Sequence, residues 1–62
     1  MERLSIKQIR VGLDMTQKEM ADFLNISELT YSRKEKGINE FYFSEIDKIC
    51  KLANLSIDKV KV

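Results

Sequence analysis

The chain has 62 residues, of which 44% are hydrophobic and 34% charged, and its net charge is only +1. A domain of this length buries only about 60% of the surface that its unfolded chain exposes, so its core must be small, but the composition excludes an intrinsically disordered chain. A single cysteine, Cys50, and the lack of histidine exclude an internal disulfide and a zinc cluster, so we expect no metal and no cofactor.

The N-terminal residues are charged and contain no apolar run of signal-peptide length, and no later stretch is long enough to span a bilayer. We therefore expect a cytoplasmic protein with no membrane contact. We also expect one domain over residues 1–62, without room for a separate small-molecule ligand domain. Neither half of the chain is a basic block, so a positive surface has to come from the folded arrangement.

Hydroxyl side chains stand at five positions suited to the N-terminus of a helix, where the oxygen accepts a bond from an otherwise unpaired backbone N–H: Ser5, Thr16, Ser27, Ser44 and Ser56. The residue types that tolerate a left-handed backbone after a last helical turn follow at Gly12, Asn25, Gly37 and Asn54. These signals predict an all-α fold with five helices, over residues 6–12, 17–24, 28–36, 45–53 and 57–61.

Apolar residues recur at helical spacing inside these ranges and predict the core-facing sides of the helices. The predicted stripes contain Ile6, Ile9, Leu13, Met20, Ala21, Leu24, Ile46, Ile49 and Ala53. We expect the core to be completed by Phe23, Leu52, Leu55, Ile57 and Val60, and we expect Cys50 to be a buried small apolar residue.

Only Asn25, Ile26 and Ser27 separate the second and third predicted helices. So short a connection forces a steep change of direction and predicts a helix-turn-helix, with the third helix on the surface and free to enter a major groove. The start of the second helix then faces phosphate. Tight helical corners also occur in domains that bind no DNA, so the spacing alone leaves both readings open.

The sequence resembles the Xre/Cro family of phage-repressor-like helix-turn-helix domains over nearly its whole length. The most specific part is residues 15–27, MTQKEMADFLNIS, continued by residues 31–37, YSRKEKG. Residues 44–49 and 54–58 are similar to the short members of phages and mobile elements. The resemblance implies a compact, lambda-repressor-like domain of five helices that binds double-stranded DNA.

The resemblance also implies which residues meet the duplex. Gln17 matches a residue that binds a backbone phosphate and braces the third helix. Side chains of that helix match those that face bases, and their chemistry fits: arginine suits guanine, glutamate accepts from the cytosine amino group, and leucine can meet a thymine methyl. The expected DNA-binding set is Thr16, Gln17, Lys18, Ser27, Glu28, Leu29, Ser32, Arg33, Lys36 and Tyr42, with Arg33 the strongest candidate. For each of them an ordinary solvated position is the alternative.

Arg10 and Glu35 match a pair that bridges the first and third helices in the family, which implies a structural role. Two positions depart from the family pattern. Residues 37–44 lack the basic residues with which many phage repressors grip phosphate, so we expect modest electrostatic affinity. Lys34 stands where many relatives have an apolar core residue, which shifts the packing to Tyr31.

We therefore expect a transcriptional regulator, a repressor, and not an enzyme. It would act as a homodimer, formed either in solution or only on DNA, through Ile57, Val60 and Val62 or through the aromatic residues 41–43. The alternative is a protein-interaction module, such as an antirepressor or a regulatory subunit, that keeps the fold without binding an operator. The near-zero net charge and the stretch after Gly37, which has no basic residue, favour this alternative, whereas Gln17 and Arg33 favour DNA.

Overall fold

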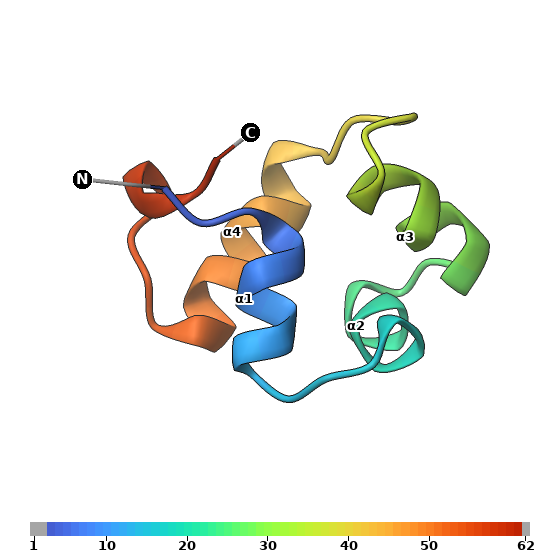
Figure 1. The fold of residues 1–62 in the computed structure, drawn as a ribbon, viewed down its shortest axis with the longest axis horizontal. Coiled ribbons are helices and arrows are strands. Elements are labelled where there is room, and N and C mark those ends of the chain that lie inside the picture. Colours follow the sequence, from blue (N-terminus) through green and yellow to red (C-terminus); the bar gives the residue numbers. More distant parts are fainter. Residues whose placement is uncertain (1–2, 62) are drawn as a thin grey trace.

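The computed structural model describes residues 3–61, which form four α-helices and one 3-10 turn (Figure 1). In chain order these are α1 (Ile6–Gly12), α2 (Gln17–Leu24), α3 (Glu28–Glu35), α4 (Phe43–Ala53) and η1 (Ile57–Lys59). The helix α1 packs against α4, α2 packs against α3, and η1 lies on the end of α4. The predicted all-α fold is confirmed for the described residues.

The first three helices begin where the sequence predicts, because each start is fixed by a local hydrogen bond. Ser5 accepts from the backbone of Gln8, whose side chain accepts from the Ser5 N–H, and Thr16 makes the same reciprocal pair with Glu19. Ser27 accepts from the backbone of Thr30 at 3.1 Å. Such caps each stabilise a helix by about 1 kcal/mol.

Two predicted helix ends and one predicted left-handed residue are wrong, and the first of these is the end of α3, which lies at Glu35 and not at residue 36. The helix α4 begins at Phe43 and not after Ser44, because the carboxylate of Glu45 accepts from the backbone N–H of Tyr42 and so makes Tyr42 the capping position. Gly12 does not supply the left-handed residue after α1. That conformation falls to Asp14, with φ of 60°, because the turn continues through Leu13. Asn25, Gly37 and Asn54 are left-handed as predicted.

The predicted fifth helix over 57–61 is also wrong, since only the 3-10 turn η1 forms there. The chain leaves the turn at Val60 in an extended conformation and forms a parallel bridge with Leu4. The backbone N–H of Lys61 donates to the carbonyl of Leu4 at 2.7 Å, and the N–H of Leu4 donates to the carbonyl of Lys59 at 2.8 Å. This bridge takes the hydrogen bonds that a longer helix would have used, and it holds the two ends of the described chain together.

The core contains Val60, which follows η1, and residues from all four helices: Ile6, Ile9, Met20, Ala21, Leu24, Tyr31, Ile46, Ile49 and Cys50. Leu13, Ala53 and Leu55 are partly buried against it. The ring of Tyr31 is fully buried and meets Phe41 edge to face, with 5.8 Å between the ring centroids. The aromatic contact stabilises the fold by about 1 kcal/mol beyond the burial of area.

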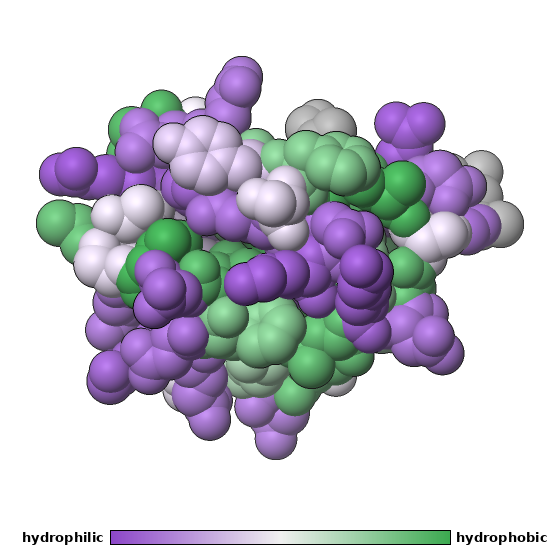
Figure 2. Space-filling view, turned by 180° about the vertical axis from the view of Figure 1, so that it is seen from behind, coloured by the Kyte–Doolittle hydropathy of each residue, from purple (hydrophilic) through white to green (hydrophobic). Residues whose placement is uncertain are grey.

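Phe23, Leu52 and Ile57, which the sequence predicts to complete the core, are instead exposed. For Phe23 and Leu52, α2 and α4 already bury other side chains, whereas η1 buries none of its residues. Figure 2 shows the face behind that of Figure 1, where groups of hydrophobic residues are separated by hydrophilic ones.

Of the residues proposed for a dimer surface, Val60 is buried in the core, Ile57 is exposed, and Val62 lies outside the described residues. Within the part of the chain that the structure describes, no helix is both long and apolar enough to cross a membrane.

Candidate nucleic-acid interface

The corner between α2 and α3 is built from residues that end one helix and start the next. Asn25 takes the left-handed conformation, with φ of 61°, and ends α2. The backbone N–H of Ile26 then donates to the carbonyl of Ala21 at 3.0 Å, and Ser27 caps α3. The two helices therefore form the helix-turn-helix that the three-residue connection predicts, with α3 at one side of the molecule (Figure 1).

The helix α3 has a buried side and an exposed side. Tyr31 and Lys34 face the interior. The expected base-facing positions lie on the other side, where Glu28, Leu29 and Arg33 are exposed and Ser32 is half-buried. Lys36, directly after the helix, is also exposed. The outer side of α3 thus combines a guanidinium, a carboxylate, a hydroxyl and an apolar group, which can recognise different base edges.

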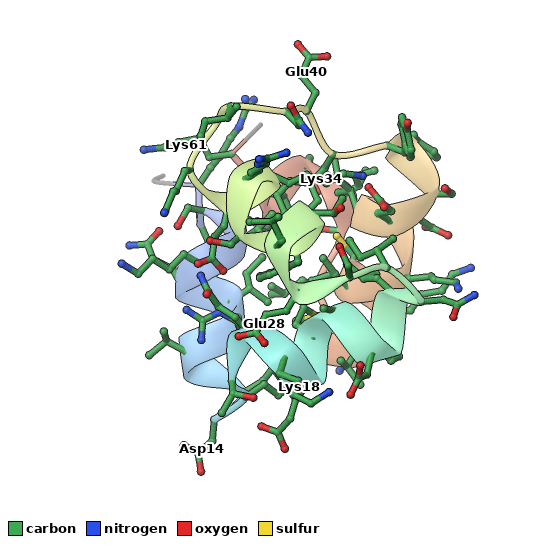
Figure 3. All side chains as sticks on the ribbon, turned by 90° about the vertical axis from the view of Figure 1, so that its right-hand side faces the viewer. Asp14, Lys18, Glu28, Lys34, Glu40 and Lys61 are labelled. Carbon is green, nitrogen blue, oxygen red and sulfur yellow. The ribbon has the colours of Figure 1, made fainter. Side chains whose placement is uncertain are left out.

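The start of α2 lies beside this surface. Thr16 and Lys18 are exposed, and Gln17 is half-buried. Figure 3 shows Lys18 and Glu28 on the same side of the molecule, with α2 and α3 in front. The first N–H groups of a helix have no partner within the helix, so the start of α2 offers donors and a partial positive charge to a phosphate. Lys18 also makes an exposed contact of 3.4 Å with Asp22, which contributes little to stability.

Glu35 joins three helices through a single carboxylate. Arg10 on α1 donates from Nε to Oε2 at 2.8 Å and from Nη2 to Oε1 at 3.3 Å. Gln17 on α2 donates from Nε2 to Oε1 at 2.9 Å, and the hydroxyl of Tyr31 on α3 donates to Oε2 at 2.6 Å. Arg10 uses its remaining nitrogen, Nη1, on the carbonyl of Met15 at 2.8 Å. These bonds fix α3 relative to the start of α2.

These hydrogen bonds also shift the pKa values of the side chains that form them. Burial by itself would raise the pKa of Glu35, but the hydrogen bonds from Arg10, Tyr31 and Gln17 outweigh it and hold the pKa below its ordinary value. The bond to Glu35 raises the pKa of Arg10. Burial, together with the bond to Glu35, raises the pKa of Tyr31 well above its ordinary value. Glu35 is therefore ionised, and Arg10 charged, at neutral pH.

Gln17 has a second partner besides the phosphate that the resemblance implies for it. Its amide nitrogen is bound to Glu35, so the side chain connects α2 to α3 in the protein without DNA. The bracing of the third helix by Gln17 is therefore present in the structure, and the phosphate contact stays a prediction.

Lys34 fills the position of an apolar core residue by pairing with a carboxylate from α4. Its Nζ lies 2.6 Å from Oε1 and 2.8 Å from Oε2 of Glu45, and the two side chains are only 5% and 9% exposed. Nζ also lies 4.1 Å from the centroid of the Tyr42 ring. In residues 3–61 every buried side-chain nitrogen and oxygen has a hydrogen-bond partner.

The sequence reasoning singled out Lys34 but missed Glu45. The signal was present in the sequence. Glu45 stands four residues before Ile49, which places it on the core-facing side of α4, where a carboxylate without a partner is not expected. Two opposite charges at two core positions predict a buried pair, although only the fold shows that these positions meet.

The segment between α3 and α4 divides its aromatic residues between core and surface. Phe41 packs against the core, whereas Tyr42 and Phe43 are exposed. Ile38 and Glu40 are exposed in the same segment, and Figure 3 shows Glu40 projecting from it. Tyr42 lies at the start of α4 with its ring 4.1 Å from Nζ of Lys34 on α3, and residues 37–44 themselves contain no lysine or arginine.

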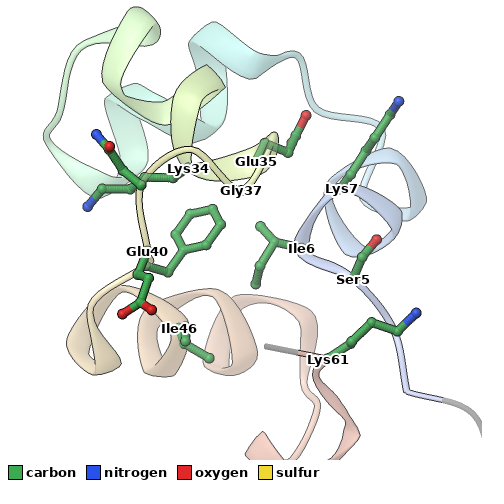
Figure 4. Close-up of a pocket in the computed structure, with 11 residues that line it drawn as sticks. Ser5, Ile6, Lys7, Lys34, Glu35, Gly37, Glu40, Ile46 and Lys61 are labelled. Carbon is green, nitrogen blue, oxygen red and sulfur yellow. The ribbon is translucent and has the colours of Figure 1, made fainter.

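A cleft of about 520 Å³ lies on another side of the fold, between α1, the segment after α3 and α4 (Figure 4). Figure 4 shows Ile6 inside the cleft, while the amino groups of Lys7 and Lys61 point away from it. Its Glu35 is already bound by Arg10, Gln17 and Tyr31. The cleft is thus separate from the exposed side of α3.

Comparison with known protein families identifies the family of the chain. A family model described as helix-turn-helix matches residues 6–60, which include all four α-helices and η1. Neither a curated protein nor a solved structure matches the chain significantly. Since the family model covers most of the chain, the protein belongs to the Xre/Cro-like helix-turn-helix family.

Proposed function

We propose that the protein binds a specific sequence in double-stranded DNA and acts as a small transcriptional regulator. The observation that carries the proposal is the arrangement of α3, whose inner side is bonded to α1, α2 and α4 while its outer side presents Glu28, Leu29 and Arg33 to solvent. A rigid helix with mixed polar and apolar groups on its free side suits direct readout of base edges.

In this arrangement α3 enters the major groove, which is about as wide as a helix with its side chains. Ser32 and Arg33 then face base edges together with the residues of the first turn, and the start of α2 rests on the adjacent phosphates through Thr16, Gln17 and Lys18. Ser27 and Lys36 flank α3 and contact the backbone. We propose repression as the outcome, because a domain that occupies a promoter needs no further activity to exclude other proteins.

We propose that two copies bind together, since one helix of eight residues reads few base pairs. Two α3 helices then occupy half-sites about one turn of DNA apart, about 34–36 Å. Sedimentation of the protein alone and with a two-site duplex measures the stoichiometry. A complex of one chain per duplex at saturation contradicts the pairing but leaves DNA binding intact.

Selection of bound duplexes from a random library tests the proposal, at low salt and with the purified chain. We expect a short motif to be enriched, and the Arg33→Ala variant to enrich it poorly. Lys51→Ala is the matched control, because Lys51 is an exposed basic residue near the end of α4, away from α3 (Figure 1). Equal enrichment of all sequences contradicts specific binding.

A second candidate function is a protein-interaction module, and the exposed apolar residues after α3 favour it. Ile38, Tyr42 and Phe43 are each about two-thirds or more exposed and lie in a segment without a basic residue. Exposed apolar side chains gathered in one segment suit a protein partner. Two results together would establish this function instead. The chain would enrich no duplex, and it would bind a protein partner in a fixed ratio, with the Phe43→Ser substitution abolishing that binding.

A further inference from the structure

The ion pair of Lys34 and Glu45 connects the recognition helix to α4 in a nearly dry environment. Figure 3 shows Lys34 extending from α3 towards the beginning of α4. Both carboxylate oxygens of Glu45 lie within 2.8 Å of Nζ. Replacing a buried pair of this kind with fitted apolar residues is often neutral or stabilising. Stability alone therefore does not account for the pair, and its contacts point to a role in geometry.

The group that the pair holds in place is Tyr42. Glu45 Oε1 accepts from the backbone N–H of Tyr42 at 2.8 Å, and Lys34 Nζ lies 4.1 Å from the centre of its ring. Yet Tyr42 is 69% exposed. An exposed tyrosine ordinarily samples several rotamers, whereas here the backbone and the ring are each fixed by a buried group.

We propose that Lys34 is a positioning residue that orients Tyr42, so that the tyrosine hydroxyl binds a phosphate of the duplex beside the groove that α3 enters. This inference rests on the proposed function. Residues 37–44 contain no lysine or arginine, and tyrosine hydroxyls are among the groups that bind phosphate oxygens in protein–DNA complexes. A held hydroxyl binds with less loss of rotamer freedom than a mobile one.

The hydroxyl contact strengthens binding without reading a base. Loss of the contact should therefore weaken binding on all duplexes alike and leave the preference among base pairs unchanged. Because Lys34 acts through Tyr42, removing both should weaken binding no more than removing the tyrosine hydroxyl alone.

The test compares four proteins: the wild type, Tyr42→Phe, the double variant Lys34→Met/Glu45→Gln, and the triple variant that combines all three substitutions. The affinity of each is measured for a selected duplex and for single-base variants of that duplex. The double variant replaces both charged groups, so no buried charge is left unpaired. It also keeps the side-chain volumes and an acceptor for the Tyr42 N–H. We expect Tyr42→Phe and the double variant each to bind about two- to tenfold more weakly, the effect of one hydrogen bond, and the triple variant to match them.

Two further measurements separate positioning from general destabilisation. Thermal unfolding checks that each variant is folded at the temperature of the binding assay. In NMR spectra the ring should shift the protons next to Nζ of Lys34 upfield in the wild type, and Tyr42→Leu should remove this shift. Lys51→Met removes an exposed lysine elsewhere on α4 and controls for the lost charge.

Wild-type affinity for either Tyr42→Phe or the double variant overturns the proposal while the proposed function stands. The proposal is also overturned if the loss of affinity in the triple variant equals the sum of the losses in Tyr42→Phe and the double variant, because additive losses show independent effects. If the wild type itself selects no duplex, the proposed function fails and this inference fails with it.

Discussion

The guanidinium of Arg10 on α1 and the carboxylate of Glu35 on α3 form a two-bond ion pair whose side chains are only 11% and 4% exposed. The pair determines how α3 is held, because Glu35 also accepts from Gln17 and Tyr31. The surface that we propose for DNA therefore depends on a carboxylate that is itself buried.

Removal of one member of this pair should destabilise the fold. Glu35→Ala leaves Arg10 charged and without its partner, so we expect the free energy of unfolding to fall by about 3 kcal/mol. A double variant with fitted apolar residues, Arg10→Met with Glu35→Leu, should lose less than Glu35→Ala alone. Urea unfolding of the three proteins measures this.

Asp47→Ala is the control, since Asp47 pairs with Lys51 at 3.0 Å on the exposed surface of α4. Its cost should stay below about 1 kcal/mol. Equal and small losses for Glu35→Ala and Asp47→Ala would show that burial of the Arg10–Glu35 pair contributes nothing.

The stability of the fold should also depend on pH, because Glu35 becomes protonated in acid. Its pKa is lower in the folded protein than its ordinary value of 4.5, so the ionised group stabilises the fold above pH 4.5. That stabilisation is lost as the pH falls through the folded-state pKa. We expect the difference in unfolding free energy between wild type and Glu35→Gln to be largest at neutral pH and to shrink in acid. A difference that stays constant from neutral to acid pH contradicts this.

How far the sequence predicted the fold depends on how local each signal was. The starts of α1, α2 and α3 follow from Ser5, Thr16 and Ser27, whose partners lie three residues away and can be read directly. The start of α4 was predicted wrongly although its cap is also local, because Glu45 binds the backbone N–H of Tyr42, which is not a usual capping residue. The helix predicted over residues 57–61 was wrong because the chain there pairs with the distant Leu4.

The candidate site divides in the same way. Periodicity and the family resemblance together indicate which residues of α3 are exposed, including Arg33. They do not indicate that Gln17 and Tyr31 share one acceptor, or that Lys34 meets Glu45, because each contact needs the distance between two helices. A core of so few residues also leaves no room for Phe23, although its hydrophobicity predicts burial.

DNA binding should weaken with salt along a shallow slope. With few basic residues on the proposed surface, we expect about two to five phosphates to be neutralised per chain. Lys36→Ala should reduce the slope of log affinity against log salt by about one, whereas Lys51→Ala, far from α3, should not change it. Titrations of the selected duplex at several salt concentrations measure the slope. A slope near zero for the wild type argues against phosphate contacts.

Arg33 should read one base pair in each half-site. It is exposed on the outer side of α3, and a guanidinium can donate two parallel bonds to guanine. Arg33→Ala should therefore cost about 1–3 kcal/mol on the best site and remove the preference at one position. Lys36→Ala is the matched control, because loss of a phosphate contact weakens all sequences equally. Affinities for a panel of single-base operator variants separate the two effects. If Arg33→Ala keeps the wild-type order of preference, Arg33 binds phosphate, and Glu28, Leu29 and Ser32 must supply the specificity.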